Sequence, residues 1–168
     1  TVGLQEACAS KRNDKFIAKI GMSYSWFVNS AIPDLESKLS SDPNCSVIIC
    51  MGVNDVCIKV YDGVSDSSDK YASKINELIK KYPNTGFYFL SVNPCDNYTV
   101  YGRTLSASSM NNASQSFNNT IKSKCRATYL DCYTYLRNNG YKTTDGIHYN
   151  DATYKKIYEF RSEERRVG

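Results

Sequence analysis

The chain has 168 residues, of which 41% are hydrophobic and 23% are charged, and its formal net charge is +4. This length suits one domain, and the composition is ordinary for a folded globular protein. Lys and Arg are spread among acids without a basic cluster, which argues against nucleic acid as a partner. No apolar run approaches the ~18 residues that cross a bilayer, so no transmembrane segment is expected.

Strand and helix patterns alternate along the chain, which predicts an α/β fold with a parallel sheet. Strands are expected where short apolar runs are bounded by glycine, proline or asparagine. The predicted strands are residues 15–20, 45–51, 86–92 and 127–132. Helical segments are predicted within residues 1–10, 23–39, 71–82 and 106–121, and from residue 150 onward.

Local signals set several boundaries. Pro33 is expected to start a second helical segment, and Ser106 and Asn150 are expected to cap helices. No internal repeat or interdomain linker is present, so residues 1–160 are predicted to form one domain. The tail, residues 161–168, departs from the apolar period and is predicted to be a non-native or disordered extension.

The cysteines do not indicate a metal site. Seven cysteines accompany a single histidine, and none forms a C-x-x-C pair. Their odd number and scattered spacing argue against a disulfide framework, although one bridge is compatible with the sequence. We expect no metal and no other cofactor.

Polar residues follow three of the predicted strands. Gly21 ends the first strand, Asn54 follows the second, and Asp145 and His148 lie in the loop after the last. The carboxyl ends of parallel strands meet at one edge of a sheet, where functional groups gather. We therefore expect these four residues to lie close together.

Each of these residues suits acyl transfer. His148 can take a proton from a hydroxyl group and return it to a leaving alcohol. Asp145 can accept the Nδ1 proton of the imidazole and leave Nε2 as the base. The Asn54 amide and the Gly21 backbone N–H can donate to a developing oxyanion, and losing one such donor typically costs about 10²–10³ in kcat.

The motifs around these residues resemble those of a known family. Gly52-Val-Asn54-Asp55 resembles the G-x-N-D block of the SGNH (GDSL-type) hydrolases, and Asp145-Gly-Ile-His148 resembles their D-x-x-H block. Gly21 fits their glycine block. The resemblance implies a flavodoxin-like, three-layer α/β/α sandwich and metal-free ester hydrolysis through an acyl-serine intermediate. It also implies that Asp145 and His148 serve a serine, while Asn54 and Gly21 stabilise the oxyanion.

The sequence departs from the family at its first block, because no Gly-Asp-Ser occurs. Thr1-Val-Gly3-Leu resembles what commonly follows that block, so we expect the nucleophile and the first strand to precede Thr1 in the intact protein. The nucleophilic serine is assigned to no residue of this chain. Ser23 and Ser25 lie in the wrong segment and are expected to start a helix. By itself, the chain is expected to hydrolyse no ester and to be poorly stable.

Other functions stay open. A non-catalytic SGNH-like module would bind a carbohydrate or a partner if the upstream residues carry no serine. A flavodoxin-like cofactor binder is disfavoured because no glycine-rich phosphate loop follows a predicted strand. A cysteine hydrolase is disfavoured because no cysteine occupies a strand-to-helix elbow facing His148. The substrate is expected to be a small-molecule, carbohydrate or lipid ester.

Overall fold

A three-stranded parallel sheet lies at the centre of the molecule. The computed structural model describes residues 2–8 and 14–167, with side chains through residue 162. Strands β1 (Ser46–Ile49), β2 (Gly86–Leu90) and β5 (Thr128–Leu130) lie in the order β1-β2-β5. The register pairs Ser46 with Gly86 and Tyr88 with Thr128. Three of the four predicted strands are thus confirmed, each shorter than predicted.

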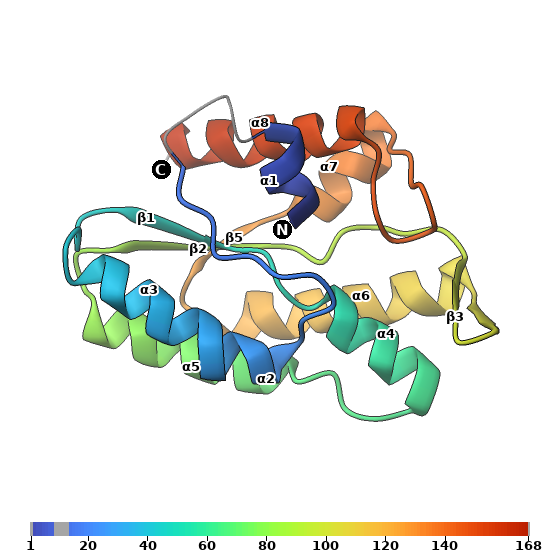
Figure 1. Cartoon of the computed structure of the whole chain (residues 1–168), viewed down its shortest axis with the longest axis horizontal. Helices are drawn as coiled ribbons and strands as arrows, with labels where there is room; N and C mark the ends of the chain where they lie inside the picture. Colours follow the sequence, from blue (N-terminus) through green and yellow to red (C-terminus); the bar gives the residue numbers. More distant parts are fainter. Residues whose placement is uncertain (1, 9–13, 168) are drawn as a thin grey trace.

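Helices cover both faces of this sheet, which confirms the predicted α/β sandwich (Figure 1). One face carries α1 (Val2–Cys8), α7 (Cys132–Asn139) and α8 (Asp151–Val167), and both α1 and α7 pack on α8. The other face carries α2 (Tyr24–Trp26), the π-helical segment η1 (Phe27–Ala31), α3 (Ile32–Leu39), α4 (Val53–Asp62), α5 (Ser68–Lys81) and α6 (Ala107–Lys124). A small antiparallel hairpin, β3 (Tyr98–Val100) and β4 (Arg103–Leu105), contacts α4.

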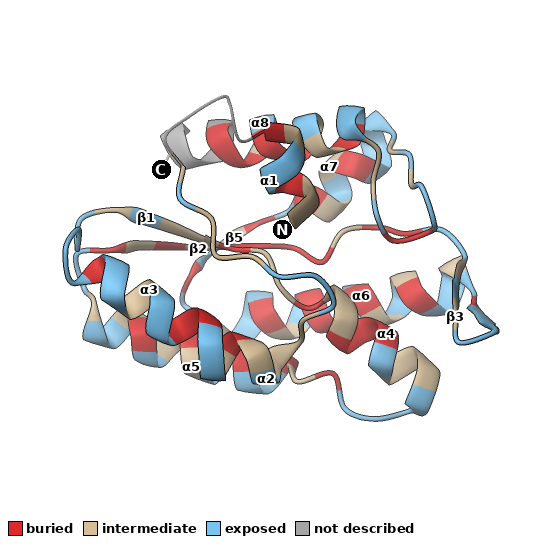
Figure 2. Ribbon diagram, viewed as in Figure 1, coloured by how far each residue is buried: buried red, intermediate tan, exposed pale blue. Residues whose placement is uncertain are grey.

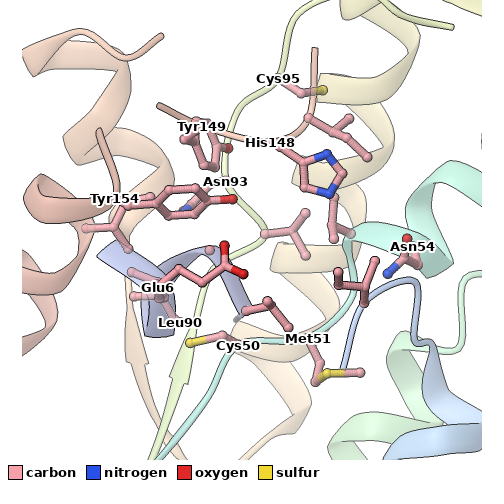
Figure 3. Close-up of a pocket in the computed structure, with 18 of the residues that line it drawn as sticks. Glu6, Cys50, Met51, Asn54, Leu90, Asn93, Cys95, His148, Tyr149 and Tyr154 are labelled. Atoms are coloured by element: carbon pink, nitrogen blue, oxygen red, sulfur yellow. The ribbon is translucent and has the colours of Figure 1, made fainter. Parts of the chain in front are cut away.

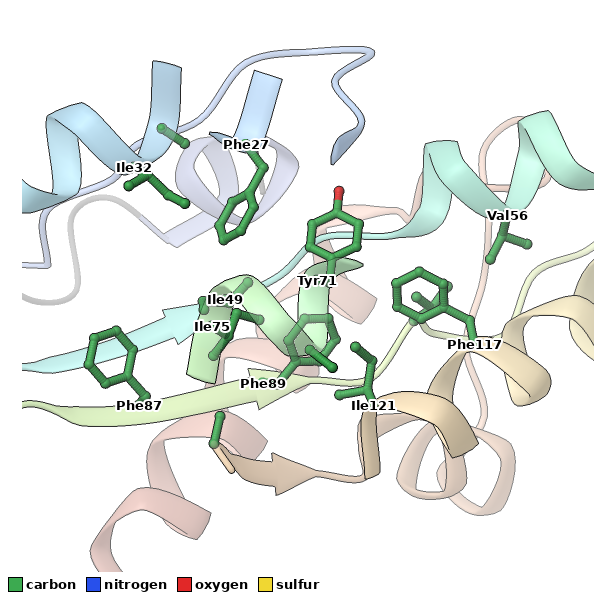
Figure 4. Close-up of a cluster of buried hydrophobic side chains, with 14 of the residues drawn as sticks. Phe27, Ile32, Ile49, Val56, Tyr71, Ile75, Phe87, Phe89, Phe117 and Ile121 are labelled. Carbon is green, nitrogen blue, oxygen red and sulfur yellow. The ribbon is translucent and has the colours of Figure 1, made fainter. Parts of the chain in front are cut away.

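Each face of the sheet has its own apolar core, because successive strand residues point to opposite sides. Phe89 of β2 packs with Tyr71 and Phe117 on the α5–α6 side (Figure 4). Its neighbour Leu90 packs with Leu136 on the α7–α8 side. Buried residues accordingly line both faces of the sheet (Figure 2). This double burial explains why the strands are near-continuous apolar runs in the sequence.

The prediction of a strand at residues 15–20 is wrong. The described part of the segment runs as irregular chain toward α2. A strand is held by hydrogen bonds to a neighbouring strand, and among the described residues β1 pairs only with β2. Ile17 nevertheless packs against the core, which accounts for the apolar pattern of the segment.

Three features were absent from the sequence prediction. They are helix α4, the β3–β4 hairpin, and helix α7, which follows β5. The predicted second helical segment is confirmed, because Pro33 lies in the first turn of α3. Ser106 caps α6 as expected, since its side chain accepts a hydrogen bond from the backbone N–H of Ser109 at 3.1 Å.

Helix α8 continues past the predicted boundary at residue 160 and ends at Val167. The Arg161 side chain is buried and donates a hydrogen bond to Asp14 Oδ2 at 2.7 Å. The segment 161–167 is therefore helical, and its non-native origin stays a prediction.

Within residues 2–8 and 14–167, no helix combines the length and the apolar character that a bilayer-spanning helix needs. No three His, Cys, Asp or Glu side chains gather as a metal-binding group in these ranges. The cysteines of the described chain are joined by no disulfide.

Candidate active site

A cavity of about 420 Å³ opens at the carboxyl ends of β1 and β2 (Figure 3). Its walls come from the residues that follow both strands, from the start of α4, and from the loop that precedes α8. Three predicted site residues, Gly21, Asn54 and His148, line it. Figure 3 shows His148 and Asn54 reaching the cavity from separate elements. The fold therefore brings together three segments that are distant in the sequence.

Asp145 holds the imidazole of His148 from two directions. Its Oδ2 lies 2.6 Å from Nδ1 of the ring, and its Oδ1 accepts the backbone N–H groups of His148 at 2.8 Å and Ile147 at 3.1 Å. The chain turns between the two residues at Gly146, whose φ is +106°. A Cβ at Gly146 would overlap the carbonyl oxygen of Asn97, so this position requires glycine.

This hydrogen bonding decides the ionisation of the pair. Partial burial alone would raise the pKa of Asp145, but the hydrogen bonds from the His148 ring and from the backbone lower it below its ordinary value. The carboxylate is therefore ionised at neutral pH. As an acceptor it stabilises the tautomer that carries the proton on Nδ1, which leaves Nε2 as the basic nitrogen.

The loop that carries this pair is braced against the residues that follow β2. The backbone N–H of Asp96 donates to the Gly146 carbonyl oxygen at 2.8 Å, and the Thr143 hydroxyl donates to Asp96 Oδ2 at 2.5 Å. The Tyr149 hydroxyl donates to the Pro94 carbonyl oxygen at 2.6 Å. The position of the imidazole is thus set by hydrogen bonds at both ends of its loop.

Asn54 lies in the first turn of α4, two residues after Gly52, the glycine that permits the turn. Gly52 has φ +112°, and a Cβ there would lie 2.7–2.8 Å from Phe117 and Val92 side-chain atoms. The Asn54 amide nitrogen donates to the Met22 carbonyl oxygen at 2.9 Å. Because an amide group has two N–H bonds, a second donor is available for a ligand in the cavity.

Gly21 is held beside Asn54 by the neighbouring residues. The hydrogen bond to Met22 fixes one side of this turn, and the backbone N–H of Tyr24 donates to Asp55 Oδ1 at 3.2 Å. The Tyr71 hydroxyl donates to Asp55 Oδ2 at 3.0 Å. Burial raises the pKa of Asp55 despite these hydrogen bonds. Asp55 therefore joins three segments around the site.

None of the candidate serines is arranged as a nucleophile. Ser91 is the one serine of the described chain that lines the cavity. Its hydroxyl donates to Asn93 Oδ1 at 3.3 Å and accepts the backbone N–H of Tyr133 at 2.8 Å. Ser23 and Ser25 start α2 as predicted and lie outside the cavity lining.

The first turn of α1 also reaches the cavity. Val2 and Gly3 belong to its lining, together with Glu6 from the next turn. Gly3 lies so close to Tyr154 of α8 that a Cβ would overlap the aromatic ring. The amino end of α1 is therefore fixed at the edge of the cavity by its packing on α8.

Asp96 and Thr143, which brace the loop of His148, were not predicted from the sequence. Asp96 follows a predicted strand at the same sheet edge as Asn54, and this position was a usable signal. Its partner Thr143 lies 47 positions later, and no local pattern marks the pairing.

Comparison with known proteins gives one family and two similar folds. The family profile described as GDSL-like Lipase/Acylhydrolase matches residues 10–160. An acetyl xylan esterase, AlAXEase, is 19% identical, with a TM-score of 0.60 over 96% of this chain and 87% of that chain. A Streptococcus pneumonia protein provisionally assigned as a platelet activating factor is 17% identical, with a TM-score of 0.67 over 96% of this chain and 76% of that chain. No curated protein matches the sequence significantly. At these identities the two structures support the fold alone.

Proposed function

Because the chain belongs to the GDSL-like lipase/acylhydrolase family, we propose that it supplies the base and the oxyanion donors of a serine ester hydrolase. The family match confirms the resemblance seen in the motifs and supports hydrolysis as the class of reaction. The observation that carries the proposal is the Asp145–His148 pair, at 2.6 Å, beside a cavity that Asn54 and Gly21 also line.

In each half-reaction His148 acts first as a base and then as an acid. Nε2 of His148 takes the proton of the serine hydroxyl as the oxygen attacks the acyl carbon. The oxyanion accepts hydrogen bonds from the Asn54 amide and the Gly21 backbone N–H. As the ester bond breaks, His148 returns the proton to the leaving alcohol. Water then hydrolyses the acyl-serine by the same steps, with Asp145 orienting the ring throughout.

The nucleophile is proposed to be a serine of the intact protein upstream of Thr1. Three observations support this assignment. The sequence has no Gly-Asp-Ser, and Ser91 is engaged in other hydrogen bonds. The first turn of α1, at Val2 and Gly3, lines the same cavity as His148, which brings the amino end of this helix to the site where the serine is needed.

We propose an ester of a short acyl group, and an acetyl ester of a carbohydrate in particular. Apolar side chains such as Leu90, Val92 and Ile147 line the same cavity as the imidazole and suit an acyl group. The carbohydrate follows the name of the acetyl xylan esterase, whose fold is similar.

The test compares two proteins for hydrolysis of p-nitrophenyl acetate, the present chain and the same chain with its natural upstream segment. We expect no turnover by the first and turnover by the second that His148→Ala abolishes. Turnover by the present chain that depends on His148 would overturn the external nucleophile. If the extended protein carries no serine before Thr1 and is inactive, a binding module replaces the enzyme.

A further inference from the structure

The tip of the β3–β4 hairpin carries an aromatic residue, Tyr101, in an unfavourable backbone conformation. Tyr101 and Gly102 form the two-residue loop and have φ values of +48° and +74°, the sign that a type I′ turn requires at both positions. Asparagine or glycine adopts this conformation easily, whereas a bulky side chain is strained there. Tyr101 is also 89% exposed, so burial of the ring does not compensate for the strain. A strained, exposed ring is a feature from which function can be inferred.

Neighbouring side chains extend this ring into a platform, formed by Ile58, Tyr61, Tyr101 and Arg103. The rings of Tyr61 and Tyr101 meet edge to face, with centroids 6.0 Å apart. The Arg103 guanidinium lies 5.3 Å from the Tyr61 ring centroid and donates to the Tyr61 carbonyl oxygen at 2.7 Å. Ile58, which lies on α4 with Tyr61, is 42% exposed.

This platform continues from the candidate active site along α4. Asn54, Ile58 and Tyr61 are spaced i, i+4 and i+7, so they share one face of the helix. Seven residues of helix rise about 10 Å, and the Tyr61–Tyr101 contact extends the row further. The platform is therefore long enough to contact a chain of several units whose ester lies in the cavity, whereas an isolated acetyl ester would not reach it.

The chemistry of the platform fits a carbohydrate. A pyranose ring presents an apolar C–H face and a rim of hydroxyl groups, and exposed tyrosine rings offer a matching face with a polar edge. The Arg103 guanidinium, whose centre lies 5.3 Å from the Tyr61 ring centroid, adds hydrogen-bond donors beside the rings. Lys59, the nearby cation on α4, is engaged by Asp66 at 2.6 Å, so the platform has no cluster of basic groups to select a highly anionic polymer.

We propose that Ile58, Tyr61, Tyr101 and Arg103 form a subsite that binds the carbohydrate chain of a polymeric ester, with the Tyr101 ring as its outer contact. This proposal rests on the ester hydrolase function proposed above and names the substrate class of that site. The binding itself requires no nucleophile, so it can be measured on the present chain.

The experiment measures binding of soluble O-acetylated xylan to the chain, by calorimetry or affinity electrophoresis. Tyr101→Asn removes the ring and places at this position a residue that the turn prefers. We therefore expect an unchanged or higher Tm together with binding that is weaker by about tenfold, as loss of a ring contact implies. Tyr101→Phe retains the ring and should bind as the parent does.

Three results would overturn the subsite. These are no binding of xylan by the parent chain, equal binding by the parent and Tyr101→Asn, and Tyr101-dependent binding of neutral or anionic phospholipid vesicles in place of xylan. The last result would identify a lipid-contacting surface. Failure of p-nitrophenyl acetate hydrolysis in the extended protein would leave these binding outcomes readable, so the two proposals fail separately.

Discussion

Oδ2 of Asp145 lies 2.6 Å from the ring nitrogen Nδ1 of His148, while Oδ1 of the same carboxylate accepts the backbone N–H of that histidine at 2.8 Å. One side chain therefore fixes both the ring and the backbone of the proposed base. Because His148 is the single histidine of the chain, its ring nitrogens report on this arrangement without overlap from other residues.

Asp145→Asn should change the tautomer of His148. The amide that replaces the carboxylate can present its NH₂ group to Nδ1, which stabilises the Nε2–H form and removes the basic nitrogen from the cavity. Long-range ¹H–¹⁵N spectra of the neutral imidazole should shift from the Nδ1–H pattern to the Nε2–H pattern. In the intact enzyme we expect kcat to fall by about 10⁴.

A matched control for this change is Asp131→Asn, which alters the cap of α7 away from the cavity. It should leave the histidine spectrum as it is. An Asp145→Asn protein with the parent spectrum would remove Asp145 from the orientation of the base.

Asn54→Ala should lower kcat of the intact enzyme by about 10²–10³ with a smaller effect on KM, because an oxyanion donor acts in the transition state. The same change removes the hydrogen bond to Met22, so the Gly21 turn is expected to loosen as well. The control is Asn112→Ala, an exposed position on α6. A fall in kcat/KM that resides wholly in KM would assign Asn54 to substrate binding.

Local sequence patterns predicted much of the fold for a physical reason. Residues 45–51 and 86–92 are buried on both faces, so their apolar character is continuous and visible without knowledge of their neighbours. The same pattern misled at residues 15–20, because a strand depends on a pairing partner that local sequence does not report. The β3–β4 hairpin was missed because its turn is Tyr101–Gly102, whereas the strong turn signal is Asn-Gly or Asp-Gly.

The candidate site was predictable in part. Asn54 follows a confirmed strand, β1, whereas Gly21 follows irregular chain and His148 follows α7. Gly21, Asn54 and His148 do share a cavity, and Asp145 does contact His148, while their catalytic roles stay predictions. The hydrogen bonds that hold these groups join residues far apart in the chain, and their geometry arises only on folding. The bond from the Thr143 hydroxyl to Asp96 Oδ2, for example, joins residues 47 positions apart.

Gly146→Ala should displace the loop that carries His148. The added Cβ would meet the carbonyl oxygen of Asn97, and the backbone has φ +106°. We expect a loss of about 2–4 kcal/mol in the free energy of unfolding, since backbone strain and steric overlap add. Urea denaturation and the histidine NMR spectrum should both respond.

Gly63→Ala is the control for this change, because Gly63 has φ +73° and open space around it. It should cost only the strain of the left-handed conformation, about 1 kcal/mol, and leave the histidine spectrum intact. Equal losses for the two variants would mean that contact with Asn97 is unimportant.

Tyr71→Phe should destabilise the protein by about 1–3 kcal/mol, because it removes a hydrogen bond to a buried carboxylate. The Tyr71 hydroxyl lies 3.0 Å from Asp55 Oδ2, and Tyr71 is fully buried. Its removal should raise the pKa of Asp55 further above the ordinary value, since a donor that stabilises the charged form is lost. Urea denaturation measures the loss, and Tyr101→Phe, at an exposed ring, should show none.

The stabilising effect of Asp66 should depend on pH. Burial alone would raise the pKa of this carboxyl, but hydrogen bonds from Lys59 Nζ at 2.6 Å and from Ser68, including its backbone N–H at 3.0 Å, lower it. A carboxyl with a lowered pKa in the folded state stabilises folding above its unfolded pKa of about 3.9, and this contribution is lost as the pH falls through the folded value.

Asp66→Asn should therefore cost about 1–3 kcal/mol in the free energy of unfolding at pH 7, and the difference from the parent should shrink toward pH 3. Urea denaturation at both pH values measures it. The pKa of Asp145 is also lowered, but Asp145 is present in both the parent and the variant. Its contribution to the pH dependence of stability therefore cancels when the two proteins are compared at the same pH. A difference that stays constant from pH 7 to pH 3 would show that Asp66 acts through its shape and neutral hydrogen bonds, with no contribution from its charge.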